Sequence, residues 1–288
     1  MDIHAKQSAD YRLPGTTTAG GQVKKNVFDL RGDVDVRPMG SLSVVIPAYN
    51  EAEILETTVT TVVAGLQELG LDWWELIICE NGSTYGTLPI ALRLAREIPG
   101  VLVVSLGHAD YGAAMRAGFL AARGDVIVNF DADYYDMDFV KRALRQDADI
   151  AVAAKSLKDS EDTRAFLRRL ASRTFGWFVR SMLKLRVSET HGMKLYHRRA
   201  TQHLALAVIS TKDLFDTELI ARAEWSGLAI EALPIRTVEM RHSRSGILRR
   251  VPRTIWGLTR IRLLSRKAFN ARVQPAPNAL QPALKEAA

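Results

Sequence analysis

The stretch Val126-Ile-Val-Asn-Phe-Asp131-Ala-Asp133 is an apolar, β-branched run that ends in two carboxylates. Such a run has the composition of a buried strand, and a charged group at its end is costly unless it is paired or used. Residues two apart in a strand point to the same side, so Asp131 and Asp133 can converge. Two hard oxygen ligands suit Mg²⁺ or Mn²⁺ and leave other positions for phosphates. The alternative is that both carboxylates only cap the helix that follows.

Upstream of this stretch, segments with strand character alternate with segments of helical spacing. A chain of 288 residues is long enough for one large α/β domain or two smaller ones. The alternation predicts a mostly parallel sheet with helices on both faces. We expect strands at 42–47, 75–79, 101–106, 126–130 and 150–154, and helices at 53–70, 87–97 and 113–123.

Polar residues directly follow three of the predicted strands. They are Pro47-Ala-Tyr-Asn-Glu51, Glu80-Asn-Gly-Ser-Thr84 and Asp131-Ala-Asp133. Open parallel sheets bind ligands beyond the carboxyl ends of their strands. We therefore expect these loops to meet at one edge of the sheet and to form the functional site.

The composition is that of an ordinary globular protein, with 47% hydrophobic and 25% charged residues. The single cysteine, Cys79, lies in an apolar run, and we interpret it as a buried thiol in a reducing compartment. The N-terminal residues lack the apolar core of a signal peptide, and no apolar run approaches the about 20 residues that span a bilayer. We expect a protein that is soluble or bound to a membrane surface.

The formal net charge of +7 points to an anionic partner. Zinc-ligand spacing, aromatic RNA-binding signatures and helix-turn-helix patterns are absent from the sequence, which argues against nucleic acid. Two segments, 164–185 and 247–269, combine basic residues with bulky apolar ones such as Trp177 and Trp256. Helices of this kind can lie in the headgroup region of a membrane. The alternative is that they pack on the sheet with their arginines in solvent.

Taken together, these motifs resemble the inverting family 2 glycosyltransferases of the GT-A fold. Within that family they look most like the polyprenyl-phosphate glycosyltransferases, the dolichol-phosphate mannose synthase group. The resemblance covers roughly residues 42–245. It is carried by Val44-Val-Ile-Pro-Ala-Tyr-Asn-Glu51, Glu75-Leu-Ile-Ile-Cys-Glu-Asn-Gly-Ser-Thr84, Gly112-Ala-Ala-Met-Arg-Ala-Gly118, Asp131-Ala-Asp133, Asp149-Ile-Ala-Val-Ala-Ala-Lys155, Gly192-Met-Lys-Leu-Tyr196 and Phe215-Asp-Thr-Glu218.

The resemblance implies a role for each group of residues. Asp131 and Asp133 would hold Mg²⁺ or Mn²⁺ on the diphosphate of a nucleotide-sugar donor linked to GDP or UDP. The nucleoside would be bound by Pro47, Ala48, Tyr49 and Glu51, with Glu80 accepting hydrogen bonds from the base or the ribose. The donor or acceptor phosphates would be gripped by Lys155, Arg173, Arg241 and Arg244, although each of these could also be an ordinary solvated charge.

The nature of the acceptor decides whether a general base is needed. A lipid monophosphate is already ionised near neutral pH, so positioning and charge stabilisation suffice. A sugar hydroxyl needs a carboxylate to take its proton, and Asp216 and Glu218 are the candidates. Alternatively, these two residues only cap a helix or orient donor hydroxyls.

Some residues depart from the pattern of the polyprenyl-phosphate group. Tyr135 stands where that group often has Gln or Ser as a further metal ligand. Asp136 or His242 could supply the missing ligand instead. His108 and Thr190 also stand where that group usually has other polar residues. These departures affect the acceptor that the resemblance implies, and they do not affect the fold.

The sequence thus predicts a metal-dependent hexosyltransferase that moves a sugar, mannose or glucose, onto a polyprenyl phosphate at the cytoplasmic membrane face. It would be peripheral on the inner face of that membrane. The alternatives are transfer to a hydroxyl of a soluble or cell-envelope glycan, or a degenerate protein that only binds sugar nucleotides. The expected organisation is a tail at 1–39, the GT-A domain at 40–245, a basic amphipathic segment at 246–272 and a tail at 273–288.

Overall fold

The structure, a computed structural model, describes residues 40–155, 157, 161–162, 166–187, 189–237 and 247–265. All of them belong to one of the two units into which the chain divides, Arg37–Ala288. The predicted tails at 1–39 and 273–288 lie outside the described residues. The predicted domain ends at residue 245, and the predicted basic segment runs from 246 to 272. These three residues also lie outside the described residues, so the boundaries remain predictions.

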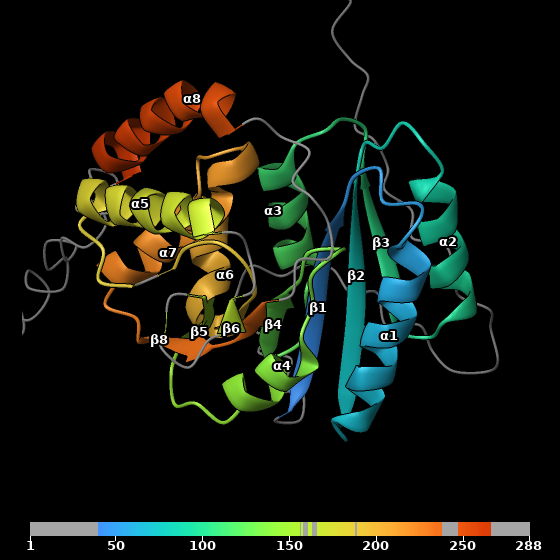
Figure 1. Cartoon of the computed structure of the whole chain (residues 1–288). Helices are drawn as coiled ribbons and strands as arrows, with labels where there is room; N and C mark the ends of the chain where they lie inside the picture. The colour runs from blue at the N-terminus through green and yellow to red at the C-terminus, as the bar shows by residue number, and fades with distance from the viewer. Residues whose placement is uncertain are drawn as a thin grey trace, which may run out of the picture. The chain divides into compact units, whose positions relative to one another are not determined.

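A seven-stranded sheet forms the centre of this unit, with the strand order β3-β2-β1-β4-β7-β5-β8 (Figure 1). Strand β7 runs antiparallel to both of its neighbours, and the other neighbouring pairs are parallel. The predicted α/β fold with a mostly parallel sheet is confirmed. The strands are β1 (Ser41–Ala48), β2 (Trp73–Asn81), β3 (Val101–Leu106), β4 (Val126–Asn129), β5 (Ile150–Ala154), β7 (Lys194–His197) and β8 (Ile230–Pro234).

Helices cover both faces of the sheet, as the alternating pattern predicts (Figure 1). Strand β1 shows why: Val44 and Ile46 enter one hydrophobic core and Val45 enters the other, because successive strand residues face opposite sides. The first core is closed by α1 (Leu55–Glu68), α2 (Thr87–Glu97) and α4 (Met137–Ala143). The second is closed by α3 (Tyr111–Ala121), α6 (Arg198–Ala207) and α7 (Phe215–Trp225), with the 3₁₀ turn η1 (Lys212–Leu214) leading into α7.

Helix α3 begins two residues before the start that the apolar spacing indicates. The reason is Asp110, whose carboxylate accepts a hydrogen bond of 3.0 Å from the Ala113 amide and caps the helix. The apolar pattern marks the buried face of a helix, whereas its first residue is set by the cap.

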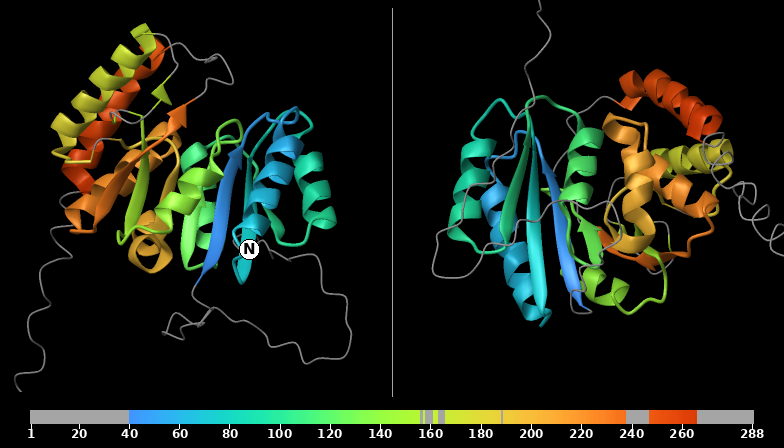
Figure 2. Two further views of the ribbon diagram at one scale, coloured as in Figure 1. Left: turned by 60° about the horizontal axis from the view of Figure 1, so that its bottom comes forward. Right: turned by 180° about the vertical axis from the view of Figure 1, so that it is seen from behind.

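The two basic segments form helices that lie side by side, α5 (Phe166–Leu183) and α8 (Ile247–Arg260), the latter followed by the π-helical turn η2 (Ile261–Ser265) (Figure 2). Val179 and Leu258 are buried in the second core, so both helices pack on the protein. Trp177 and Trp256, by contrast, are 64% and 66% exposed. Within the described ranges, no helix has the length and apolar character needed to cross a membrane. A short parallel pair, β6 (Glu161–Asp162) with β9 (Arg236–Thr237), completes the described elements.

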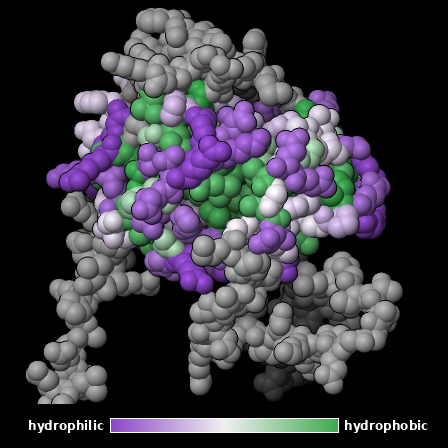
Figure 3. Space-filling view, turned by 90° about the horizontal axis from the view of Figure 1, so that it is seen from below, coloured by the Kyte–Doolittle hydropathy of each residue, from purple (hydrophilic) through white to green (hydrophobic). Residues whose placement is uncertain are grey.

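Exposed apolar surface is not confined to these two helices. Figure 3 shows another face, on which hydrophobic residues gather near the middle and hydrophilic residues surround them. Because more than half of an ordinary protein surface is apolar, such an area alone does not indicate a partner. What distinguishes α5 and α8 is the combination of exposed tryptophans with basic residues.

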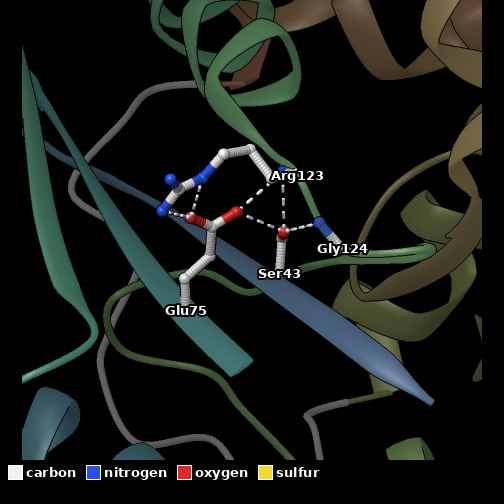
Figure 4. Close-up of polar contacts among 4 residues, drawn as sticks. All are labelled: Ser43, Glu75, Arg123 and Gly124. Atoms are coloured by element: carbon white, nitrogen blue, oxygen red, sulfur yellow. Dashed lines mark hydrogen bonds and ion pairs between the residues drawn. The ribbon is translucent and has the colours of Figure 1, made fainter. Parts of the chain in front are cut away.

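Near the amino ends of β1 and β2, a polar cluster around the buried Glu75 ties the strands to the start of β4 (Figure 4). Glu75 accepts hydrogen bonds from the Ser43 hydroxyl at 2.7 Å and from the Arg123 backbone amide at 2.7 Å. The Arg123 guanidinium adds two further bonds to the same carboxylate, at 3.1 and 2.8 Å. Ser43 in turn accepts a bond from the Gly124 amide at 2.8 Å. This cluster stabilises the sheet at the edge opposite the three polar loops.

Candidate active site

The three polar loops meet at the carboxyl ends of β1, β2 and β4, where they surround a cavity of about 270 Å³. The cavity therefore lies where open parallel sheets bind their ligands. Its walls bring together most of the predicted nucleotide-binding and metal-binding residues. They are formed by Pro47, Ala48, Tyr49, Glu51, Asn81, Tyr111, Asp131, Ala132 and Asp133.

Hydrogen bonds between the loops after β1 and β2 fix one wall of the cavity. Asn50, which adopts a positive φ of 55°, accepts a bond from the Thr84 amide at 2.9 Å. The backbone amide of Asn50 donates a hydrogen bond to the Ser83 hydroxyl at 3.0 Å. The Glu51 amide donates to the Thr87 hydroxyl at the start of α2. The left-handed turn at Asn50 thus aims the backbone and the half-exposed Tyr49 at the cavity.

Glu80 lies beneath this wall and is 1% exposed. Its carboxylate accepts hydrogen bonds from the Ser83 amide at 2.6 Å and from the Ser105 hydroxyl at 2.7 Å. Burial acts to raise the pKa of Glu80, but these bonds outweigh it and hold the pKa below its usual value. Glu80 is therefore ionised. Its hydrogen bonds hold the loop that follows β2, and its negative charge lies next to Asn81 of the cavity wall.

The turn after β4 carries the two metal-motif aspartates. Asp131 and Tyr134 exchange backbone hydrogen bonds of 3.1 Å in both directions, which closes a tight turn. Thr58 of α1 donates to the Ala132 carbonyl at 2.6 Å and ties the turn to the core. Asp131 and Asp133 both line the cavity as a result.

The pKa of Asp131 is raised to about 6. The largest cause is burial, and the negative charges of Asp216 and Asp133 add to it. The positive charges of Lys194 and Lys155 act in the opposite direction. A carboxylate that is costly to ionise, with further carboxylates near it, favours the binding of a cation.

The start of α3 forms the opposite wall. Asn81 accepts a hydrogen bond of 2.7 Å from the Asp110 amide and positions Tyr111 at the cavity. Gly82, with a φ of +65°, allows the chain to pass close to His108, because a Cβ atom there would lie 2.6 Å from the His108 carbonyl carbon. His108 therefore belongs to a tightly packed crossing of two loops.

A buried polar cluster lies behind Tyr111. The Tyr111 hydroxyl donates to Asp216 Oδ2 at 2.7 Å, and Lys194 Nζ lies 3.5 Å from Asp216 Oδ1. Lys194 is fully buried and also donates to the Gly192 carbonyl at 2.7 Å. Burial, followed by the charge of Asp216, raises the pKa of both Tyr111 and Tyr196 well above the usual value. Both tyrosines are therefore neutral.

Asp216 and Glu218, the two predicted acid–base candidates, have different surroundings. Asp216 lies in the cluster behind the cavity wall, whereas Glu218 is fully buried elsewhere. The Glu218 carboxylate accepts hydrogen bonds from the Ile209 amide at 3.1 Å and from the Ser210 amide at 2.8 Å, and it forms an ion pair of 2.6 Å with Arg222. These contacts tie down the loop before η1, and they do not bring Glu218 to the cavity.

Among the predicted phosphate-binding residues, Lys155 is placed close to the aspartate turn. Its Nζ lies 4.9 Å from the centre of the Tyr134 ring. Arg173 lies on α5, but its side chain is outside what the structure describes. Arg241, Arg244 and the possible metal ligand His242 fall outside the described residues altogether, and their roles remain predictions.

The residues that depart from the family pattern have structural contacts. Tyr135 packs its ring 6.4 Å from that of Phe130, on the first core. Asp136 caps α4 by accepting hydrogen bonds from the Asp138 and Phe139 amides. Thr190 is buried, and its hydroxyl lies 3.2 Å from that of Thr217. Asp136 is thus occupied as a cap in this arrangement.

The donor set at the cavity fits a hard divalent cation that is shared with a phosphate ligand. Two carboxylates, Asp131 and Asp133, face the cavity, and in the described part of the chain no group of three or more His, Cys, Asp or Glu side chains comes together as a metal site. Magnesium and manganese sites of this kind use one or two carboxylates and complete their shell with substrate oxygens and water.

Asn81, Tyr111 and Lys194 are not among the individual residues predicted for the site. Asn81 lies within the predicted site loop Glu80–Thr84, and Tyr111 directly precedes the motif that begins at Gly112, so sequence position was a usable signal for both. Lys194 stands inside the apolar run Met193-Lys-Leu-Tyr196, and a lysine within a buried strand is itself a sign of a charge partner.

Comparisons with known proteins agree with this geometry. Residues 43–205 match the family model described as Glycosyl transferase family 2. Glycosyltransferase AglD of Haloferax volcanii is 32% identical over 236 residues, which are 76% of this chain and 37% of that protein. A dolichyl-phosphate beta-glucosyltransferase of Drosophila melanogaster is 28% identical over 72% of this chain and 70% of its own length.

A shorter match lies in the same family of names, and a solved structure shares the fold. An undecaprenyl-phosphate 4-deoxy-4-formamido-L-arabinose transferase of Salmonella paratyphi A is 34% identical over 34% of this chain and 31% of its own. The chain thus spans about a third of the length of two of these relatives. Among solved structures, the glucosyl-3-phosphoglycerate synthase of Mycobacterium tuberculosis, in complex with Mn²⁺, UDP and glucosyl-3-phosphoglycerate, superimposes with a TM-score of 0.55. It is 20% identical, and the match covers 78% of this chain and 80% of that one.

Proposed function

The chain belongs to glycosyl transferase family 2, and from that premise we propose that it transfers a hexose from a nucleotide-sugar donor to a polyprenyl phosphate, with Mg²⁺ or Mn²⁺ as cofactor. The observation that carries the proposal is a cavity that is lined both by the Pro47–Glu51 loop and by Asp131 and Asp133. A nucleoside held by the loop places its diphosphate at the two carboxylates.

The protein's own residues bind and orient the donor. The half-exposed Tyr49 and Pro47 offer apolar surface to the nucleoside, and Glu51 lines the same wall. Glu80 keeps the loop after β2 in place, and it would accept hydrogen bonds from the base or the ribose. Asp131 and Asp133 would hold the cation, which when bound neutralises the charge that grows on the departing nucleoside diphosphate.

Lys155 is proposed to bind a phosphate of the donor or the acceptor. Its position over the Tyr134 ring keeps it beside the aspartate turn, and an ammonium group suits a phosphate oxygen as a point charge. A lipid phosphate attacks without a general base, so this acceptor needs only positioning and charge stabilisation from the protein. The dolichyl-phosphate and undecaprenyl-phosphate relatives support this acceptor class.

Contact with the inner, cytoplasmic face of a membrane is proposed through α5 and α8. Trp177 and Trp256 are exposed on these neighbouring helices, and Arg260 stacks over the Trp256 ring at 5.8 Å. Tryptophan with arginine is a combination suited to the headgroup region of anionic lipids. Such binding would bring the lipid acceptor to the protein without a spanning helix.

Transfer to a sugar hydroxyl is the second candidate function, and one observation favours it. Asp216 is a buried carboxylate behind the cavity wall, and its Oδ1 accepts no hydrogen bond from the described residues. Such a group could take a proton from a hydroxyl acceptor. Glu218 is not proposed as the base, because backbone amides and Arg222 occupy its oxygens.

A transfer assay with UDP- and GDP-linked glucose and mannose tests the proposal. The wild-type protein with Mn²⁺ should transfer label to a short-chain polyprenyl phosphate, and Asp131→Asn with Asp133→Asn should lower the rate at least about 100-fold. Label that passes to the free polyprenol or to a soluble glycan, and not to the phosphate, would favour the second candidate. Donor turnover that does not change in the double variant would refute the metal-dependent mechanism, and complete absence of turnover would favour a protein that only binds nucleotides.

A further inference from the structure

Lys194 is a fully buried lysine in the middle of the sheet. An ammonium group is rarely taken out of water unless a counter-charge and hydrogen bonds compensate. Its compensation consists of the Gly192 carbonyl at 2.7 Å and the carboxylate of Asp216 at 3.5 Å. Asp216 is itself only 4% exposed. The two residues therefore form a buried ion pair of zero net charge.

The sheet register places this pair next to the metal motif. Lys194 on β7 is the antiparallel partner of Asn129 on β4, and Asn129 precedes Asp131 by two residues. Partners across an antiparallel pair are about 5 Å apart, and two residues along a strand add about 7 Å. The Lys194 charge is thus close enough to Asp131 to lower the pKa of its carboxyl group.

The other polar groups that contact Asp216 or lie beside Lys194 carry no charge. Tyr111 donates to Asp216 Oδ2, and it is held neutral by a raised pKa. Tyr196 Oη and Asn129 Oδ1 are buried and without hydrogen-bond partners among the described residues. Both are uncharged groups. Asp216 is therefore the carboxylate that forms an ion pair with Lys194, whereas Asp131 interacts with the ammonium without such a contact.

We propose that Asp216 neutralises the buried Lys194 ammonium so that the cavity can accept a divalent cation at Asp131 and Asp133. In this role Asp216 is a positioning residue that acts through Lys194, and it takes no proton from an acceptor. The inference rests on the proposed function, because it assumes that the two aspartates hold the cation. The opposite effects of Lys194 and Asp216 on the pKa of Asp131 agree with it.

Variants that remove these charges test this inference through Mn²⁺ binding, measured from the free-ion signal in electron paramagnetic resonance with saturating UDP or GDP and compared with the nucleotide alone. Asp216→Asn leaves the ammonium unpaired and should weaken Mn²⁺ binding about tenfold, because like charges repel strongly at low dielectric. Lys194→Met together with Asp216→Asn removes both charges and should restore the affinity to within about threefold of the wild type. Lys194→Arg with Asp216→Asn keeps a permanent positive charge and should bind Mn²⁺ more weakly than the Met double variant.

Tyr196→Phe is the matched control, since it removes a buried hydroxyl that interacts with Asp216, lies outside the cavity wall and carries no charge. It should leave Mn²⁺ affinity within about threefold, as no charge near the ion changes. Equal losses in Tyr196→Phe and Asp216→Asn, or no recovery in the Met double variant, would overturn the inference and indicate a role in geometry or direct ligation. Melting curves show whether each variant is folded, and if Asp216→Asn alone does not fold, the comparison of the Met and Arg double variants decides.

The same experiment separates this inference from the proposed function. A wild-type protein that binds no Mn²⁺ with either nucleotide would refute the metal site itself. A wild type that binds Mn²⁺ and loses it in Asp131→Asn, while Asp216→Asn binds normally or is not rescued, would refute only the charge-balancing role.

Discussion

The Tyr111 hydroxyl and the Asp216 carboxylate are joined by a hydrogen bond of 2.7 Å that links α3 to α7 across 105 residues of sequence. Tyr111 lines the cavity on one side of this bond, and Asp216 is paired with Lys194 of β7 on the other. The bond therefore connects the part of the sheet that carries the nucleotide loops to the part beyond β4. Both halves of the chain contribute to one site.

Removing this bond should cost stability. Tyr111→Phe leaves one oxygen of a buried carboxylate without its donor, and hydrogen bonds to charged groups contribute about 1.5–3 kcal/mol. We expect the free energy of unfolding in urea to fall by that amount. Tyr85→Phe is the control, because Tyr85 is 75% exposed and its hydroxyl can bond to water. Equal stability of the two variants would show that the bond contributes nothing.

The cluster around Glu75 predicts a loss of stability without a loss of function. Glu75→Gln replaces a carboxylate that accepts bonds from Ser43 and Arg123, and it should lower the free energy of unfolding by about 2–4 kcal/mol. The cluster lies at the edge of the sheet opposite the cavity, so nucleotide affinity of the folded protein should not change. Urea unfolding and a nucleotide titration measure the two effects, and weakened nucleotide binding in folded Glu75→Gln would argue against this separation.

The raised pKa of Asp131 predicts how stability depends on pH in metal-free buffer. The folded protein keeps this proton up to about pH 6, whereas the ordinary pKa of an aspartate in an unfolded chain is 3.8. The proton's contribution to stability is therefore full below about pH 4 and lost as the pH rises through 6. Relative to Asp131→Asn, the wild-type melting temperature should decline over this interval. Parallel curves for the two proteins would contradict the shift.

Adding Mn²⁺ and a nucleoside diphosphate should reverse that decline in the wild type. The cation binds the ionised carboxylates, so its stabilising effect should appear above about pH 6 and fade below it. Asp131→Asn should show little stabilisation at any pH. Thermal-shift series with Mn²⁺ alone, nucleotide alone and both together distinguish the cation from the nucleotide.

The exposed tryptophans of α5 and α8 predict binding to anionic lipid. Replacement of Trp177 and Trp256 by Ser should weaken binding to phosphatidylglycerol vesicles about tenfold or more, since each aromatic ring contributes buried area in the headgroup region. Vesicle flotation measures this, and Tyr85→Ser, an exposed aromatic on the β2 loop, is the control. If the wild type, the tryptophan double variant and Tyr85→Ser all float equally, α5 and α8 do not form the membrane contact.

Much of the fold could be predicted because its signals are local. Residues such as Val44, Val45 and Ile46 alternate between two cores, and the loops after β1, β2 and β4 carry polar residues at the strand ends. The antiparallel strand β7 could not be predicted in this way. Its pairing with both β4 and β5 depends on long-range contacts, whereas Lys194–His197 alone shows only a short, mixed pattern.

The roles of Asp216 and Glu218 show the same limit within the site. Residues two apart on a helix point about 200° apart, so both carboxylates cannot face one cavity. Which of them does so depends on how α7 packs, and the spacing of the two residues carries no information on that. The packing places Asp216 against Tyr111 and Lys194, and it directs Glu218 to the Ile209 and Ser210 amides.

The central claim is that Asp131 and Asp133 anchor a divalent cation on the diphosphate of the donor. Calorimetric titration of UDP and GDP into the wild type and into the Asp131→Asn, Asp133→Asn double variant, with and without Mn²⁺, tests it most directly. We predict that Mn²⁺ strengthens nucleotide binding at least about tenfold in the wild type and has no effect in the double variant. An equal Mn²⁺ effect in both proteins would contradict the account.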